Sequence, residues 1–356
     1  MKLSKKIIAL LLSICFIIAG LTGCGQNTAN GTNAPAQTTA PQTERTVVDM
    51  AGRSVKLPAE IKSIATFGSI GVLNDFVETL GEGSKICNEM SASFTKTDRW
   101  KYQYLFAPQL KTSPVFQDAS GAILMEKVLQ TKPDLCLAMT KAETDQLAAQ
   151  GQNVLYLSWD KTDDVKKCMT LLGEALNKQE VAADYLAYFD KTVAKAQDLT
   201  KDLQETDKKK VVYGSITTYT QPHLIAEWWI PAAGGISVTN NGRTAQSLTY
   251  TLEDLLKWNP DVMILSDPAI KKDVLADGRL GNIPAVKNKQ IFSIPCVAHV
   301  WGNRTTEQPL TILWTMNKLY PKIMTTEALA KEISYFYSHF FKYNLTDEQI
   351  KEIIGS

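Results

Sequence analysis

The chain is organised around residues 177–203, which read NKQEVAADYLAYFDKTVAKAQDLTKDL from Asn177 to Leu203. Neither Gly nor Pro occurs in this stretch, so nothing interrupts a ladder of helical hydrogen bonds. Asn177 is a favourable N-cap, and Glu180 three residues later completes the pattern of a capping box. A helix over 178–203 would be about 39 Å long at the usual rise per residue. Its apolar residues recur with the helical period and form one stripe: Ala182, Tyr185, Leu186, Phe189, Val193, Ala196 and Leu203.

A second pattern occurs once on each side of this helix. Residues 125–134 (MEKVLQTKPD) and 252–261 (LEDLLKWNPD) each place a Glu seven positions before a Pro-Asp pair. An apolar run follows each, at 135–138 and 262–265. Because Pro disfavours helix at the preceding residue, each unit predicts a helix that ends before Pro, and then a buried strand. The stretch 177–203 could be an ordinary surface helix inside one domain, but matching units on both sides favour a rigid connection between two similar lobes.

The expected fold class is therefore α/β, with two lobes joined by one long rigid helix. Each lobe should have a central, mostly parallel sheet flanked by helices. At 356 residues the chain is long enough for roughly two domains. We expect an N-terminal lobe over 45–176, a linker helix over 177–207, a C-terminal lobe over 208–324 and a helical extension over 325–356 that packs on a lobe surface.

The amino terminus has the pattern of a targeting segment. Residues 1–23 combine a basic start with an apolar run that is typical of a secretory signal and short for a membrane span. Leu21-Thr-Gly-Cys24 resembles the lipobox of bacterial lipoproteins, which implies cleavage before Cys24 and diacylation of its sulfur. Residues 24–44 are rich in Asn, Thr, Gln, Ala and Pro and should form a flexible tether. An uncleaved anchor helix is the alternative; either way we expect a protein anchored on the extracytoplasmic face of the cell membrane.

Composition and motifs argue against several classes of function. The net charge is +1 with no basic block, so nucleic acid is not an expected partner. No G-x-S-x-G, H-E-x-x-H or P-loop motif occurs, so we expect no enzyme, although an extracytoplasmic enzyme on a similar scaffold is an alternative. The cysteines beyond Cys24 show no C-x-x-C spacing, and a disulfide among them stays open. They are Cys87, Cys136, Cys168 and Cys296.

Aromatic and basic residues occur near predicted strand ends, where open α/β sheets bind ligands. One group lies in the irregular stretch 90–114, and another in the loop 296–304, which contains an imidazole, an indole and a guanidinium. Arg can clamp a carboxylate, Trp can stack, and His can donate a hydrogen bond. For each residue the alternative is structural, as a core aromatic or a salt bridge. The candidate ligand-binding residues are Arg99, Trp100, Trp159, Tyr219, Trp228, His299, Trp301 and Arg304.

The lipobox, the tether, the two Glu-(x6)-Pro-Asp units, the central helix and the Gly234-Gly235 turn together resemble the solute-binding lipoproteins of ABC importers. The resemblance is to the helical-backbone class, class III, that handles iron–siderophore, haem and cobalamin, and it covers residues 46–321. It implies a ligand cleft between the lobes, small hinge motion, and delivery to a membrane permease and its ATPase. It also implies that one Glu on each lobe docks onto permease arginines. The matching residues are Glu126 and Glu253.

Ligand choice is the least transferable property of this family. The Trp, Tyr and Arg content near strand ends favours a large, partly aromatic, anionic chelate: a ferric siderophore first, then haem or a corrinoid. Relatives that hold bare metal use clustered His and carboxylates, whereas His223, His299 and His339 lie far apart in the sequence. We therefore expect no metal site and no resident cofactor. We also expect a monomer; a sensor or adhesion lipoprotein without a permease is the remaining alternative.

Overall fold

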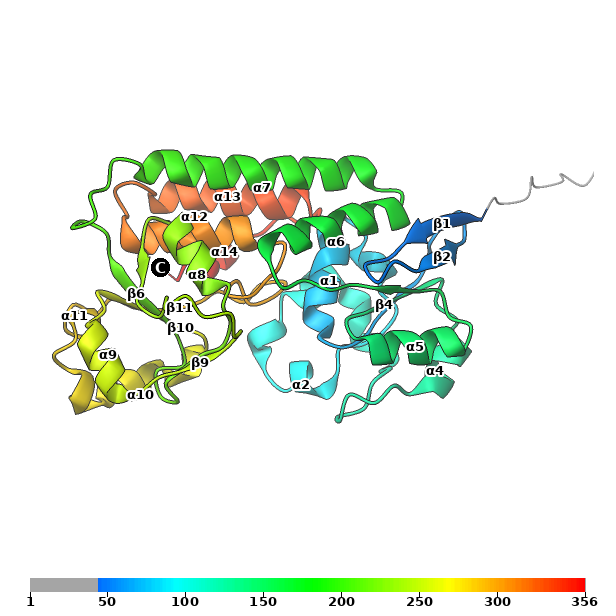
Figure 1. Cartoon of the computed structure of the whole chain (residues 1–356). Coiled ribbons are helices and arrows are strands. Elements are labelled where there is room, and N and C mark those ends of the chain that lie inside the picture. Colours follow the sequence, from blue (N-terminus) through cyan, green and yellow to red (C-terminus); the bar gives the residue numbers. More distant parts are fainter. Residues whose placement is uncertain (1–43, 356) are drawn as a thin grey trace, which may run out of the picture. The chain divides into compact units, whose positions relative to one another are not determined.

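The computed structural model describes residues 44–355, in which two separate parallel sheets form the framework (Figure 1). The sheet of the N-terminal lobe has the order β3-β4-β5, and that of the C-terminal lobe has the order β11-β10-β6-β8. Two antiparallel pairs, β1–β2 and β7–β9, accompany them. The predicted α/β class is confirmed. The strands are β1 (Arg45–Val48), β2 (Ser54–Leu57), β3 (Ile64–Thr66), β4 (Leu135–Ala138), β5 (Val154–Tyr156), β6 (Lys210–Gly214), β7 (Thr220–Gln221), β8 (Ile236–Ser237), β9 (Leu248–Thr249), β10 (Val262–Leu265) and β11 (Ile291–Ser293).

Helices flank the sheets in both lobes. Residues Gly83–Lys85 form a short 3-10 turn, and Ile86 directly after it makes an isolated parallel bridge with Ile64. None of the helices in the described range is long and apolar enough to cross a membrane. The α-helices are α1 (Ile70–Thr79), α2 (Ala92–Thr95), α3 (Gln103–Phe106), α4 (Met125–Thr131), α5 (Lys141–Ala149), α6 (Thr162–Ala175), α7 (Gln179–Thr200), α8 (Ala226–Ala232), α9 (Leu252–Trp258), α10 (Lys271–Ala276), α11 (Pro284–Lys287), α12 (Gln308–Leu319), α13 (Thr326–His339) and α14 (Asp347–Ile354).

The two matching sequence units fold alike. Helices α4 and α9 have seven residues each, and both end at a residue with left-handed backbone, Lys132 (φ 53°) and Asn259 (φ 47°), just before the Pro. The Asp after each Pro ties down a neighbouring strand. Asp134 accepts backbone N–H bonds ahead of β3, and Asp261 accepts one from Lys210 at the start of β6 (2.9 Å). Strands β4 and β10 follow with the predicted bounds, so the repeat is structural.

The long central helix is α7, which is slightly shorter than predicted. It packs against α6 of the N-terminal lobe and against α8 and α12 of the C-terminal lobe. The expected N-cap was wrong, because Lys178 holds that position while Asn177 has a left-handed backbone (φ 57°). Asn177 ends α6 instead: the Lys178 N–H bonds to the carbonyl of Gly173 (2.7 Å), the long bond of a Schellman motif.

Side chains on each sheet alternate between two cores. On β4, Leu135 and Leu137 join the main core, whereas Cys136 faces a smaller cluster with Val128 of α4 and Leu147 of α5. Strand β10 alternates in the same way between the main core and a cluster that includes residues of α9, α10 and α11. The main core also takes residues from α1, α6, α7, α12 and α13. It is therefore continuous from one sheet to the other.

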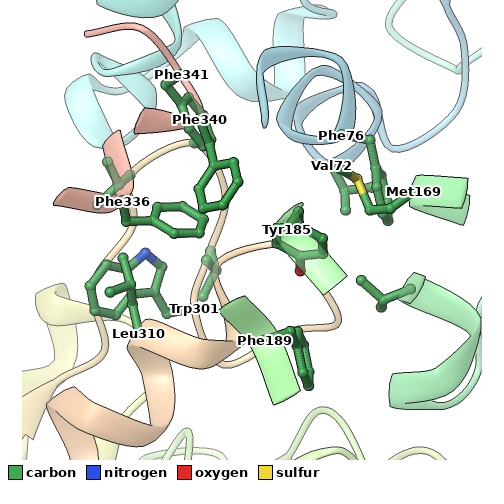
Figure 2. Packing of buried hydrophobic residues seen from close by; sticks show 14 of the residues in the cluster. Val72, Phe76, Met169, Tyr185, Phe189, Trp301, Leu310, Phe336, Phe340 and Phe341 are labelled. Atoms are coloured by element: carbon green, nitrogen blue, oxygen red, sulfur yellow. The ribbon is translucent and has the colours of Figure 1, made fainter. Parts of the chain in front are cut away.

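Tyr185 of α7 lies within this shared core. Figure 2 shows its ring between Phe76 of α1 on one side and Trp301, in the loop after β11, on the other. Its hydroxyl donates a hydrogen bond to the carbonyl of Thr306 (2.9 Å). The helix that joins the lobes is thus bonded to the segment that leads into α12.

The carboxyl-terminal helices contact both lobes. Helix α13 packs on α12 and pairs with α7 through Glu332 and Lys195 (2.5 Å). Helix α14 reaches the N-terminal lobe, where Glu352 pairs with Lys101 (2.5 Å). The carboxyl-terminal helices were expected to pack on the surface of one lobe. In the structure they contact both lobes. The predicted signal segment, Cys24 and nearly all of the tether lie outside the described residues.

Candidate ligand site

Segments that follow strand ends in the two sheets meet at the candidate site. Trp159 lies shortly after β5, Ser266 directly follows β10, and the loop 296–304 follows β11. The N-terminal lobe also contributes a 3-10 turn, Asp98–Trp100, from its irregular stretch. Ligands of open α/β sheets bind at the carboxyl ends of strands, so the sequence-based expectation and the geometry point to the same region.

Two arginines cross the site in opposite directions. Arg99 of the N-terminal lobe donates from Nη2 to the carbonyl of Ser266 in the C-terminal lobe (2.6 Å). Arg304 of the C-terminal lobe donates from Nε to the carbonyl of Trp159 in the N-terminal lobe (3.1 Å). Carbonyl oxygens are neutral acceptors, so neither bond neutralises a guanidinium. The nearest ion pair of Arg99, to Asp267, is long at 4.0 Å, and its Nε is buried with no partner in the described range.

The loop after β11 is held by the buried carboxylate of Glu307. Its two oxygens accept backbone N–H bonds from Ala298 (3.0 Å) and His299 (2.8 Å). The loop also needs Gly302, because a Cβ there would lie 2.1 Å from the hydroxyl of Tyr213 on β6. These contacts fix the position from which His299 and Arg304 enter the site.

His299 lies against Trp100 with ring centroids 5.1 Å apart, and it is 5% exposed. Burial lowers the pKa of His299 to about 3, so the imidazole is neutral at neutral pH. Its Nδ1 has no hydrogen-bond partner among the described residues. A Cβ on Gly71 would lie 3.1 Å from Trp100 and 3.3 Å from His299, so the start of α1 packs directly against both rings.

His223 was not among the predicted site residues. Burial, together with the charge of Arg304, lowers the pKa of His223 to about 4, so this imidazole is neutral at neutral pH. Burial also lowers the pKa of Arg304, while Asp160 counteracts this effect. The site therefore combines two guanidinium groups with two neutral imidazoles. That donor set suits an anion.

The other predicted site residues lie partly in the site and partly in the core. Trp159 is half-buried and packs edge-on against a Phe ring of α1, with centroids 5.1 Å apart. Trp228 is half-buried and stacks on a Phe ring of α7, and Tyr219 packs on Tyr250. Trp301 is fully buried in the main core, which is the structural alternative that the sequence left open.

Two cavities take residues from both lobes. One of about 790 Å³ is lined by Arg99 together with Lys318 of α12, and burial lowers the pKa of Lys318 to about 8. The other, of about 360 Å³, is lined by Asp160 and by Arg243, whose ion pair with Glu227 (3.0 Å) is almost fully buried. Both volumes lie in the range of small-molecule sites.

Three buried acids lie behind the site, a cluster that sequence reasoning missed. Asp75 and Glu78 of α1 and Glu307 at the start of α12 are each at most 2% exposed. Asp75 accepts hydrogen bonds from the backbone N–H (2.9 Å) and hydroxyl (2.6 Å) of Thr306. Burial, reinforced by neighbouring carboxylates, raises the pKa of Asp75 and Glu78. No group of three or more His, Cys, Asp or Glu side chains within residues 44–355 is placed to hold a metal ion.

Two parallel-sheet lobes with polar donors at their strand ends form an architecture that can bind a solute. Residues 88–298 match the periplasmic binding protein family, and the chain belongs to that family. The class inferred from the sequence, the binding proteins of ABC importers, is thereby confirmed.

Relatives in the family take different ligands. Over 95 residues the chain is 33% identical to the molybdate-binding protein MolA of Haemophilus influenzae, a stretch that spans 26% of this chain and 27% of MolA. Over 211 residues it is 22% identical to the iron(3+)-hydroxamate-binding protein YxeB of Bacillus subtilis, spanning 59% of each. The chain thus matches 27% of MolA and 59% of YxeB, less than two thirds of each.

Solved structures share the fold over nearly their whole length. A periplasmic solute-binding protein from Veillonella parvula superposes with a TM-score of 0.77 at 24% identity, over 88% of this chain and 97% of that one. MolA bound to molybdate superposes with a TM-score of 0.73 at 20% identity, over 85% of this chain and 99% of MolA.

Proposed function

We propose that the protein is the solute-binding lipoprotein of an ABC importer and that it captures a compact oxyanion of the molybdate class. The observation that carries this proposal is the pair of crossing arginines, one from each lobe. The hydrogen bonds of Arg99 and Arg304 go to neutral oxygens, which are backbone carbonyls and the side-chain amide of Gln246. An oxyanion between the lobes would therefore gain charge-assisted hydrogen bonds from both guanidinium groups.

The surroundings of the arginines support a small anion over a large one. Both imidazoles are neutral, so His223 and His299 can donate to an anion without a proton being taken up. The aromatic rings at the site pack against protein rather than forming an open stack, as Trp100 does against His299. The similarity to MolA is consistent with this choice.

A ferric siderophore is the second candidate, and haem or a corrinoid follows. The cavity of about 790 Å³ beside Arg99 supports a larger chelate, because that volume suits a ligand of several hundred daltons. The similarity to the hydroxamate-binding protein YxeB points the same way.

Delivery would proceed through a membrane permease and its ATPase. Glu126 and Glu253, the proposed docking residues, are exposed and have no hydrogen-bond or ion-pair partner in the described part of the chain. A lipid on Cys24 would hold the monomeric protein at the membrane, on its extracytoplasmic face.

A thermal-shift panel tests the ligand. The mature protein is heated with molybdate, tungstate, sulfate, phosphate, a ferric hydroxamate, haemin or cobalamin. Molybdate at ~100 times its dissociation constant should stabilise the fold by ~2.7 kcal/mol. This stabilisation should fall in Arg99→Ala and in Arg304→Ala, because each removes charge from one side of the site. If only the ferric hydroxamate stabilised the protein, the proposed ligand would be a siderophore and not an oxyanion.

A further inference from the structure

We infer that two exposed leucines, Leu129 on α4 and Leu256 on α9, form with Glu126 and Glu253 a pair of equivalent docking patches for the importer's permease. Each patch is one acid with one leucine on the same helix face. This inference rests on the proposed function, because it names further contact residues for the same partner.

The leucines hold the same place in the two structural repeats. Each lies three residues after the docking Glu, and residues three apart share a helix face. Leu129 is 39% exposed and Leu256 is 42% exposed. Single exposed leucines are common on protein surfaces, so either one alone would carry no weight. Their recurrence at matching positions, each beside an unpaired Glu, is the informative feature.

These leucines are not the main inward contacts of their helices. In each seven-residue helix the inward contact is made by the preceding residue, Val128 in α4 and Leu255 in α9, both fully buried. These two residues enter the clusters on the sheet faces turned away from the main core that contains α7. Both helices accordingly lie on the side of the molecule away from α7 in Figure 1.

The partner must present two matching surfaces, each with a cation beside an apolar recess. A permease built as a symmetric pair of subunits offers two equivalent sites, one for each patch. The carboxylate would supply orientation and on-rate, and the leucine would supply apolar burial in the centre of the contact. The two docking patches of this chain would thus contact two equivalent surfaces of the importer.

The test compares three double variants in binding to the cognate permease–ATPase complex in nanodiscs. They are Leu129→Ala with Leu256→Ala, Glu126→Ala with Glu253→Ala, and the control Leu105→Ala with Leu275→Ala. The control removes one exposed leucine from each lobe outside the patches, at 36% and 49% exposure. Thermal unfolding and molybdate titration of each variant alone verify that fold and ligand site are intact.

We expect the leucine pair in the patches to weaken binding to the importer about tenfold, and the control pair to leave it unchanged. If the glutamate pair abolishes binding while the patch leucines match the control, the inference fails and the proposed function stands. If the wild-type protein does not bind the complex, both fail together.

Discussion

At the scale of single residues, Glu78 is a buried acid whose environment has no signal in the sequence. It sits in α1 among apolar neighbours, its Oε1 is buried without a partner in the described range, and its Oε2 accepts a 3.3 Å bond from Gln103. Burial raises its pKa, and the charges of Asp75 and Glu307 raise it further. In the unfolded chain the same carboxyl loses its proton near its ordinary pKa. The folded state therefore binds more protons, and its stability should fall as the pH rises above about 4.5.

Glu78→Gln should remove part of this pH dependence. At pH 8 the amide carries no charge in the buried cluster, so the variant should melt several degrees above the wild type. At pH 5, close to the ordinary pKa of a Glu side chain, the two should melt within about a degree of each other. Glu60→Gln, at an exposed position between β2 and β3, is the matched control and should follow the wild type at both pH values. Parallel melting curves for the Glu78 variant and wild type across this range would contradict the account.

Residue roles were less predictable than residue positions. In the structure Trp100 lies against His299, and each arginine donates a hydrogen bond to a carbonyl of the opposite lobe. The sequence singled out all four residues as candidates. It could not separate them from Trp301, which lies in the same loop, because the direction of a side chain in an irregular loop is not periodic. No local pattern in the sequence pointed to His223. The role of these residues in binding stays a prediction.

At the scale of elements, the crossing of α6 and α7 depends on a glycine. A Cβ on Gly173 would lie 2.6 Å from the Cβ of Ala182, and neither atom can rotate away. Alanine gains about 0.5–1 kcal/mol of helix propensity over glycine. Overpacking of a rigid contact costs about 1–3 kcal/mol, so the clash should prevail.

Gly173→Ala should therefore reduce the free energy of unfolding, by about 1–2 kcal/mol in urea titrations after the propensity gain. Gly278→Ala is the control, because a Cβ there meets no atom within 4 Å. A Gly173 variant as stable as the wild type would show that the two helices can separate without cost.

Elements with a local signal were predicted closely. Helices α4 and α9 end before Pro as predicted, and the strands that follow them have the predicted bounds. The start of α7 was misplaced because Asn suits two roles: it is a good N-cap and also a good left-handed residue at a helix end. Asn177 could cap the start of α7 or end α6 with a left-handed backbone. It ends α6, and packing where α6 crosses α7 decides between these two roles. The short bridge at Ile86 has no periodic signal at all.

At the scale of the whole molecule, one continuous core joins the two sheets. Residues of α7 belong to it together with residues of α1, α12 and α13, and α14 adds contacts to both lobes. A hinge that opened widely would have to expose this core, so ligand exchange should need only small changes. The sequence predicted the connecting helix and the two sheets. It did not predict the shared core, because long-range packing leaves no local pattern.

The central claim is that one oxyanion binds between Arg99 and Arg304. The most direct measurement is an anomalous difference map at the molybdenum edge, from crystals of the mature protein grown with one equivalent of molybdate. The account predicts a single peak between the two guanidinium groups, near His223 and His299. A map without a peak there, or with its peak at another position, would contradict it.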